Sequence, residues 1–244
     1  MAKTYFVVSD VHSYYTQLRY ALTKSGFQSN NTEHILIVCG DAFDRGNESW
    51  QMLKFLYRLH KANRLVYIKG NHEELLQMCK NEMDRFSACQ RVHYQNGTYK
   101  TWEAIYKNDP KLTKMYEELM EHMVDYYELG KYIFVHGWIP YTGDYMEPSF
   151  NKNWKKGNWK RARWENGMEM WHKGIKVPHK IIVCGHWHTG WGHYMLHNKG
   201  ETQYDCYDIF KDKGIIALDA CTAITERVNV LIIHETDLDN KRRV

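Results

Sequence analysis

Apolar residues near the N-terminus form short runs, and each run is followed by a polar or glycine-bearing turn and then by helical spacing. Thr4–Ser9, Glu33–Cys39 and Leu65–Lys69 are short, apolar and partly β-branched, which predicts three strands. Tyr14–Lys24 and Glu48–Asn63 repeat their apolar positions with the period of a helix. Strands and helices that alternate in this way are typical of an α/β protein.

The rest of the chain continues this alternation less regularly. Its predicted elements are helices between Glu74 and Glu128, broken near Gly97 and at Asp109-Pro110; strands at Lys131–Val135 and Lys180–Cys184; and a helix near Met168–His172 after the irregular stretch Pro140–Lys160. Gly214–Leu218 and Val228–His234 are predicted to be two late strands, antiparallel to each other. No linker or internal repeat divides the sequence, so we expect a single domain over residues 1–244.

The composition of the 244 residues, with 43% hydrophobic and 25% charged positions, is that of a globular protein. The apolar stretches are far shorter than the roughly 20 residues of a membrane helix, and the N-terminus lacks the pattern of a secretory signal. We therefore expect a cytoplasmic protein with no membrane partner. The net charge of +4 is too small to imply a nucleic-acid partner by itself. Cys39 and Cys184 lie in strand-like runs, where buried, reduced thiols are expected.

Polar residues gather at the ends of the predicted strands. These junctions hold Asp10, His12, Asp41, Asp44, Asn71, His72, His136, His186 and His188. Because ligands collect at the carboxyl ends of strands in an open α/β sheet, we expect these side chains to converge. Oxygen and imidazole ligands in this mixture suit Mn, Fe or Zn, and the absence of cysteine at these junctions argues against a structural zinc site.

This set holds more ligands than one ion needs, which leaves a carboxylate free to bridge two ions. A pair of ions about 3.5–4 Å apart activates water and holds the oxygens of an in-line phosphoryl displacement. Each residue also has a structural interpretation, since Asp41 and Asp44 can cap a helix and Asn71 suits a turn. The presence of several such motifs in one chain favours the metal site.

Five motifs of the chain resemble those of calcineurin-like metallophosphoesterases. They are Ser9-Asp10-Val11-His12, Gly40-Asp41-Ala42-Phe43-Asp44-Arg45-Gly46, Gly70-Asn71-His72-Glu73, His136-Gly137 and Gly185-His186-Trp187-His188. The second and third are similar to the phosphoprotein phosphatase branch, which includes bacterial and phage Ser/Thr phosphatases and symmetrical diadenosine tetraphosphate hydrolases. The resemblance implies an α/β sandwich with two central mixed β-sheets flanked by helices.

The same resemblance implies a role for each motif residue. The metal ligands would be Asp10 and His12 on the first ion, Asp41 as the bridge, and Asn71, His136 and His186 on the second ion. His72 would protonate the leaving alkoxide, Asp44 would orient His72, and Arg45 would contact the phosphate oxygens. An imidazole beside a carboxylate suits general acid catalysis near neutral pH, and arginine offers the fork that a phosphoryl group accepts.

The chain departs from the family pattern at two functional positions. Asn166 stands where many members carry an arginine that contacts the phosphate, and Arg161 or Arg163 is the candidate to replace that charge. We therefore count Arg161, Arg163 and Asn166 with Arg45 as candidate substrate-binding residues. The branch usually has Gly-His-Thr where this chain has Gly-His-Trp-His-Thr. Other metallophosphoesterases use the second histidine of Gly-His-x-His on the first metal, so His188 is a candidate ligand.

The resemblance implies a hydrolase of phosphoric esters that uses a hydroxide bridging two divalent transition metal ions, with Mn favoured and Fe, Zn or Ni as alternatives. The first substrate hypothesis is a phosphomonoester on a phosphoprotein or a small molecule, as for Ser/Thr phosphatases. The second is a dinucleoside polyphosphate or an RNA-end phosphate, and the third is a non-catalytic phosphate-binding module. The motif residues do not separate the first two hypotheses, whereas the intact ligands argue against the third.

The segment 151–164 interleaves basic residues with Trp154, Trp159 and Trp164. Basic residues with aromatic neighbours can bind a polynucleotide or a polyphosphate. A solvated loop anchored to the body by its tryptophans explains the same pattern, and we favour this second interpretation. A nucleic-acid partner is therefore not favoured by this segment.

Overall fold

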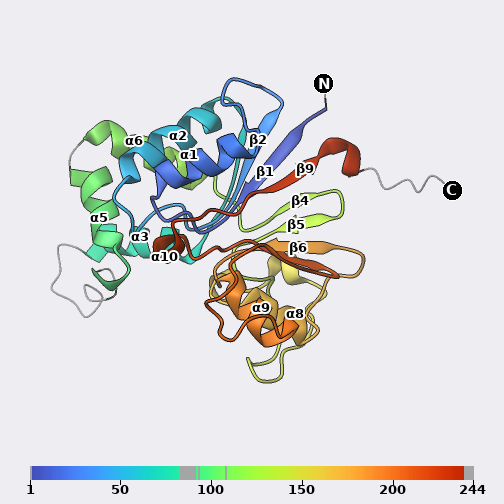
Figure 1. Ribbon diagram of the computed structural model, residues 1–244. Helices are drawn as coiled ribbons and strands as arrows, with labels where there is room; N and C mark the ends of the chain where they lie inside the picture. Colours follow the sequence, from blue (N-terminus) through green and yellow to red (C-terminus); the bar gives the residue numbers. More distant parts are fainter. Residues whose placement is uncertain (1, 83–91, 93, 108, 239–244) are drawn as a thin grey trace.

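Two mixed β-sheets pack face to face, and helices cover their outer sides (Figure 1). The computed structural model describes residues 2–82, 92, 94–107 and 109–238. The first sheet has the order β3-β2-β1-β9, formed by β1 (Thr4–Val8), β2 (His34–Cys39), β3 (Leu65–Ile68) and β9 (Leu231–His234). The second sheet has the order β4-β5-β6-β8-β7, formed by β4 (Tyr127–Leu129), β5 (Tyr132–Phe134), β6 (Ile181–Cys184), β7 (Phe210–Asp212) and β8 (Ile215–Ala217). This is the predicted architecture.

Helices α1, α2 and α6 lie outside the first sheet, and α8 and α9 lie outside the second (Figure 1). The helices are α1 (Tyr15–Lys24), α2 (Ser49–Lys61), α3 (Asn71–Glu82), α5 (Thr98–Trp102), α6 (Pro110–Glu121), α7 (Trp159–Ala162), α8 (Gly167–His172), α9 (Thr189–His197) and α10 (Thr222–Thr225), with a π-helical turn at Glu103–Lys107 and 3₁₀ turns at Trp154–Lys156 and Glu235–Asp237. Among the described residues, no helix combines the length and the apolarity that a membrane span requires.

Strand alternation explains how the first sheet is buried on both faces. Tyr5 and Val7 of β1 belong to the core between the two sheets, whereas Phe6 and Val8 belong to the core under α1 and α2. Successive strand side chains point to opposite faces, so an apolar run is needed wherever both faces are covered. The strands from the first part of the chain are apolar for this reason.

The early elements match their predictions within two residues at each end, and Asp109 caps α6 by accepting from the N–H of Lys111 at 2.9 Å. The predicted pairing of the two late strands is wrong. β8 lies parallel to β6 in the second sheet, whereas β9 lies antiparallel to β1 in the first sheet. Both strands are apolar, and the sequence pattern does not say which edge each one completes.

The structure also tests the predictions for the cysteines and for the segment 151–164. Cys39 and Cys184 are buried and free, as expected, and the other described cysteines also form no disulfide. In the segment 151–164, Trp154 and Trp159 are buried, and Trp159 stacks on Tyr126 with ring centroids 5.3 Å apart. This is the anchored loop that the sequence favoured.

Candidate active site

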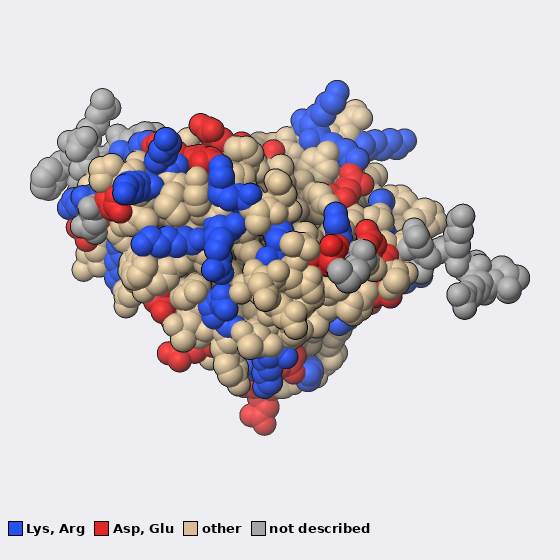
Figure 2. Space-filling model, turned by 90° about the horizontal axis from the view of Figure 1, so that it is seen from above, with Lys and Arg blue, Asp and Glu red and all other residues tan. Residues whose placement is uncertain are grey.

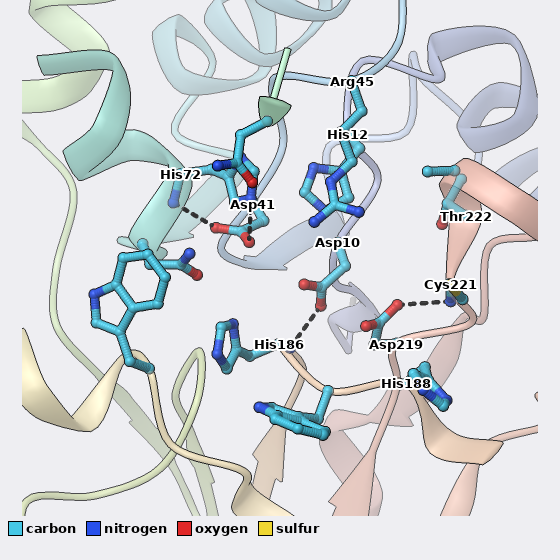
Figure 3. Close-up of a pocket in the computed structure, with 15 residues that line it drawn as sticks. Asp10, His12, Asp41, Arg45, His72, His186, His188, Asp219, Cys221 and Thr222 are labelled. Atoms are coloured by element: carbon cyan, nitrogen blue, oxygen red, sulfur yellow. Dashed lines mark hydrogen bonds and ion pairs between the residues drawn. The ribbon is translucent and has the colours of Figure 1, made fainter. Parts of the chain in front are cut away.

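A pocket of about 220 Å³ lies where strand ends from both sheets meet (Figure 3). It is lined by Asp10, His12, Asp41, Arg45, Asn71, His72, Asn96, Trp164, His186, Trp187, His188, Asp219, Cys221, Thr222 and Ala223. Asp10, Asp41 and Asn71 follow β1, β2 and β3 of the first sheet, and His186 follows β6 of the second. The carboxyl ends of strands in both sheets therefore place polar side chains in one cavity.

The turns that carry these side chains use left-handed backbone. The φ angle is +53° at Asp10, +54° at Asp41 and +69° at His186, and it is also positive at Asp44 and Arg45. This conformation costs a non-glycine residue about 1–3 kcal/mol and clusters at functional sites. The backbone strain in these turns lowers local stability, and the same turns direct the polar side chains toward the pocket.

Two glycines let the turns approach each other closely. A Cβ at Gly70 would lie 2.1 Å from Oδ1 of Asp41, and a Cβ at Gly185 would lie 2.1 Å from Oδ2 of Asp10. Any side chain at either position would displace a carboxylate of the pocket. This explains why each of these two motifs begins with glycine.

Glu73 fixes the loop that carries Asp41. Its buried carboxylate accepts hydrogen bonds from the backbone N–H groups of Asp41 at 3.0 Å, Ala42 at 3.1 Å and Gly70 at 2.8 Å. The hydroxyl of Tyr67 donates to the same carboxylate at 2.8 Å. These hydrogen bonds connect the loops after β2 and β3. The glutamate of the Gly-Asn-His-Glu motif therefore fixes the backbone that carries Asp41.

Asp41, His136 and His186 form one group of candidate ligands whose atoms lie within 4.8 Å of one another. Nδ1 of His136 lies 2.8 Å from the carbonyl oxygen of Cys39, and a proton assigned to Nδ1 leaves Nε2 of the neutral ring as an acceptor. This Nε2 faces Oδ1 of Asn71 at 2.8 Å and Oδ2 of Asp41 at 3.3 Å. With the ring neutral, this nitrogen and the two oxygens are three converging acceptors, a set that suits a cation, and a ring nitrogen bonded to a backbone carbonyl is typical of ligating histidines.

His12, Asp41 and His72 form a second group within the same distance limit. Nδ1 of His12 lies 3.0 Å from the carbonyl oxygen of Phe43, so its Nε2 is also left as an acceptor. Asp41 belongs to both groups, which is the arrangement a bridging carboxylate needs. Asp10 is buried beside them, where Oδ2 accepts from the backbone N–H of His186 at 2.9 Å. The donor set therefore fits two divalent transition metal ions.

Burial and charge oppose each other in this pocket. Burial, helped by Asp41, raises the pKa of Asp10 to about 6 despite the opposing effect of His136. Burial also lowers the pKa of His136, but the charge of Asp41 outweighs it and raises that pKa to about 10. The charge of Asp41 thus favours a proton on His136, and a bound cation would displace that proton.

His72 is held for proton transfer. Its Nδ1 lies 2.8 Å from Oδ2 of Asp44, and the hydroxyl of Thr98 donates to the same oxygen at 2.7 Å. Burial lowers the pKa of His72, but Asp41 and Asp44 outweigh this effect and raise it overall. Nε2 of His72 points toward Oδ2 of Asp41 at 3.9 Å. The ring therefore faces the bridging position with its orientation fixed from behind.

The structure gives different places to the candidate substrate-binding residues. Arg45 is exposed and points into the pocket beside His12 (Figure 3). Arg161 donates to Glu165 at 3.2 Å, and Arg163 is buried in ion pairs with Glu74 and Asp125; neither lines the pocket. Asn166 caps α8 by accepting from the N–H groups at its first turn. These three side chains are occupied by structural partners, so the structure does not bring them to the site with Arg45.

His188 lies at the edge of the pocket, apart from both ligand groups (Figure 3). Its ring stacks on Tyr204 with centroids 5.9 Å apart, and its Nδ1 is buried without a hydrogen bond to any described residue. This placement argues against the ligand role that the family resemblance gave to His188.

Asp219 is a pocket residue that the sequence analysis missed. It follows β8 and is buried, and its Oδ1 accepts from the N–H of Cys221 at 2.7 Å. Burial, together with the charge of Asp10, raises the pKa of Asp219 well above its usual value. The signal that could have found Asp219 is its position directly after the predicted strand Gly214–Leu218.

Substitution of the two neighbouring histidines should separate their roles. We expect His186→Ala to weaken binding of one ion by more than about 10- to 100-fold, because even partners outside the ligand shell contribute that much. His188→Ala should keep both ions, since its ring faces Tyr204. Elemental analysis and calorimetric titration with Mn²⁺ would measure this difference. Loss of an ion from His188→Ala would restore its ligand role.

An α/β sandwich with carboxylates and imidazoles at its strand ends is typical of the metallophosphoesterase fold. The chain belongs to the calcineurin-like phosphoesterase family, whose model matches residues 3–218. It is 39% identical over 70 residues to a symmetrical bis(5'-nucleosyl)-tetraphosphatase of Buchnera aphidicola, covering 29% of this chain and 24% of the relative. It is 30% identical over 131 residues to an asymmetrical bis(5'-nucleosyl)-tetraphosphatase of Oceanobacillus iheyensis, covering 50% of this chain and 47% of the relative.

Each of these matches spans less than half of the curated relative. Among solved structures, a cold-active protein-tyrosine phosphatase of a Shewanella species superposes with a TM-score of 0.56 at 15% identity. That match covers 95% of this chain and 75% of the other, and it supports the fold alone.

Proposed function

We propose that this phosphoester hydrolase cleaves nucleotide phosphates, with dinucleoside polyphosphates as the first candidates and Mn²⁺ as the first candidate metal. The observation that carries this proposal is one pocket that is lined by members of both candidate ligand groups and by two partly exposed indole rings. The names of the curated relatives point to the same substrate class. We therefore put nucleotide substrates first in this proposal and phosphoprotein substrates, which the sequence analysis put first, second.

The chain's own residues divide the work of hydrolysis. Two bound ions would supply Lewis acidity and a lowered pKa of water. They would be held by Asp10 and His12 on one side, by Asn71, His136 and His186 on the other, and by Asp41 between them. Arg45 would bind phosphoryl oxygens through its fork. His72 would transfer the proton on Nε2 to the leaving oxygen while Asp44 holds Nδ1.

The two indoles supply a surface that a simple phosphate does not need. Trp164 is 48% exposed and Trp187 is 38% exposed, and both line the pocket. Trp164 also contacts the ring of His186 edge-on, with centroids 5.9 Å apart. Stacking of a base on an exposed aromatic ring contributes about 1–3 kcal/mol. A nucleoside next to the reacting phosphate would use this surface, whereas a phosphoserine would leave it uncovered.

The test compares diadenosine tetraphosphate, glycerol phosphate and a phosphoserine peptide on the Mn²⁺-loaded enzyme. We expect the highest kcat/KM for the dinucleotide. Trp187→Ala should raise KM for the dinucleotide by roughly 5- to 100-fold, the value of one stacked base, and leave glycerol phosphate unchanged. Trp187 is preferred to Trp164 because Trp164 also supports His186.

Trp50→Ala is the matched control, since Trp50 is 45% exposed but does not line this pocket. If Trp187→Ala affects all substrates equally, the indole has no role in substrate choice. Phosphomonoesters are the second candidate, because a pocket of about 220 Å³ with Arg45 as its arginine suits a single phosphoryl group. A higher kcat/KM for the phosphopeptide would favour them instead.

A further inference from the structure

The outer helices α1 and α2 present a basic and aromatic surface that the catalytic pocket does not use. α1 carries Arg19 and Lys24, α2 carries Lys54, Arg58 and Lys61, and neither helix contains an Asp or Glu. In the view from above, Lys and Arg side chains form a band across the left half of the surface (Figure 2). The small net charge of the chain therefore hides a local concentration of positive charge.

A groove of about 380 Å³ lies on these helices, lined by Tyr15, Trp50, Gln51, Lys54, Phe55 and Arg58. We call it the α1–α2 groove. Trp50 is 45% exposed at its rim, and Nζ of Lys54 lies 4.6 Å from the centre of the Trp50 ring. The guanidinium carbons of Arg19 and Arg58 lie 5.1 and 5.9 Å from the centre of Phe55. Trp50 thus presents an exposed ring beside a cation, whereas Phe55 is buried beneath Arg19 and Arg58.

Three cations in or beside the α1–α2 groove have no acidic partner among the described residues. Within the described part of the chain, Arg19, Lys54 and Arg58 take part in no ion pair, whereas Lys61 pairs with Glu118 at 2.9 Å. The side-chain oxygen of Gln51 in the same groove is buried and accepts no hydrogen bond from a described residue. The groove therefore offers unpaired positive charge together with the exposed ring of Trp50.

We propose that the α1–α2 groove binds single-stranded nucleic acid. Phosphates would pair with Arg19, Lys54 and Arg58, and a base would stack on Trp50. An acidic peptide matches the charge but leaves the indole unused. A duplex hides the faces of its bases, so it cannot stack on Trp50.

The groove is also close to the catalytic pocket along the surface. Arg45 lines both that pocket and a shallow depression that includes Tyr14, Thr16 and Lys100, and Tyr15 then lines the groove. Glu48 is an acid on this path, and its carboxylate accepts from the N–H and the hydroxyl of Thr16 at the start of α1. A bound strand could therefore continue toward Arg45. The carboxylate of Glu48 on this path is already engaged by Thr16. This inference goes beyond the proposed function, because binding in the groove requires no hydrolysis.

The test measures fluorescence anisotropy of a labelled single-stranded oligouridylate of about 15 nucleotides, a length within the site sizes of such proteins, on the Mn²⁺-loaded full chain. The variant Arg19→Gln, Lys54→Gln, Arg58→Gln should bind about 10-fold more weakly or worse near 0.1 M salt, and its dependence of log K on log salt should be shallower by roughly 2. Trp50→Ala should bind roughly 5- to 100-fold more weakly, as for one lost stacked base. Hydrolysis of glycerol phosphate by both variants should be unchanged.

The matched control is Lys152→Gln, Lys156→Gln, Lys160→Gln, which removes as many exposed cations from the segment 151–164. This variant should bind as the wild type does. The proposal is overturned if the groove variant binds normally, if the control loses as much affinity, or if Trp50→Ala has no effect. It is also overturned if a duplex or polyglutamate competes as well as the single strand. Failure to hydrolyse diadenosine tetraphosphate would count against the proposed function and not against the groove.

Discussion

Asp41→Asn should remove both metal binding and activity while leaving the chain folded. Asp41 belongs to both ligand groups, and its Oδ1 accepts from the N–H of His72 at 3.0 Å, a contact that an asparagine oxygen can keep. We expect affinity for both ions to fall by more than about 100-fold, since even indirect partners of a ligand contribute up to that much. Activity should fall by about 10³-fold or more, because bound ions supply several kcal/mol of transition-state stabilisation.

Elemental analysis, hydrolysis assays and circular dichroism on the same samples would check this result. Asp208→Asn is the matched control, because its side chain is 65% exposed and pairs with Arg227 outside the pocket. A fully active Asp41→Asn variant, or a wild-type enzyme that stays active after complete chelation, would refute the two-metal site.

His72→Asn should lower kcat by roughly 10²–10⁴, the usual contribution of a general acid. The ring faces Asp41 while Asp44 holds its other nitrogen, so we expect its loss to affect proton transfer and to leave both ions bound. The defect should be small for nitrophenyl phosphate, whose leaving group needs little protonation, and large for an alkyl phosphate. The comparison of the two substrates therefore isolates the proton transfer.

The geometry makes this experiment decisive, because His72 also falls within the ligand group of His12 and Asp41. If His72→Asn loses an ion, or if its kcat falls by the same factor for nitrophenyl phosphate and for the alkyl phosphate, His72 is a ligand and not the general acid. His179→Asn is the control, since His179 is exposed and has a φ of +60°, which asparagine tolerates. It should behave as the wild type does in both assays.

The sequence predicted the parts of this protein whose signal is local. Strand ends at Asp10, Asp41 and Asn71 lie at one pocket because parallel strands of one sheet deliver their ends to the same edge. The sequence analysis predicted no helix at Thr189–His197, where the structure has α9 with Gly190 and Gly192 inside it. A Cβ at Gly192 would lie 2.3 Å from Sδ of Met168, so that glycine serves close packing.

The local sequence pattern did not predict contacts between side chains that are distant in the sequence. Arg161 pairs with Glu165, and Arg163 pairs with Glu74 and Asp125. The spacing of these residues in the sequence does not predict that the two arginines form these ion pairs and stay away from the pocket. The place of His188 depended in the same way on Tyr204, which lies in a stretch without regular secondary structure. The family motifs therefore predicted the catalytic candidates better than they predicted the pocket wall.

The position of β9 has a consequence for the biosynthesis of the enzyme. β9 covers the edge of β1 that does not face β2, and it places Leu231 and Ile233 in the core between the sheets. A chain still on the ribosome lacks this strand until residue 234 has left the exit tunnel, although the pocket residues identified above end at Ala223. The first sheet, which carries Asp10 and Asp41, is completed only then. We therefore expect metal binding by a nascent chain to begin only after residue 234 has emerged.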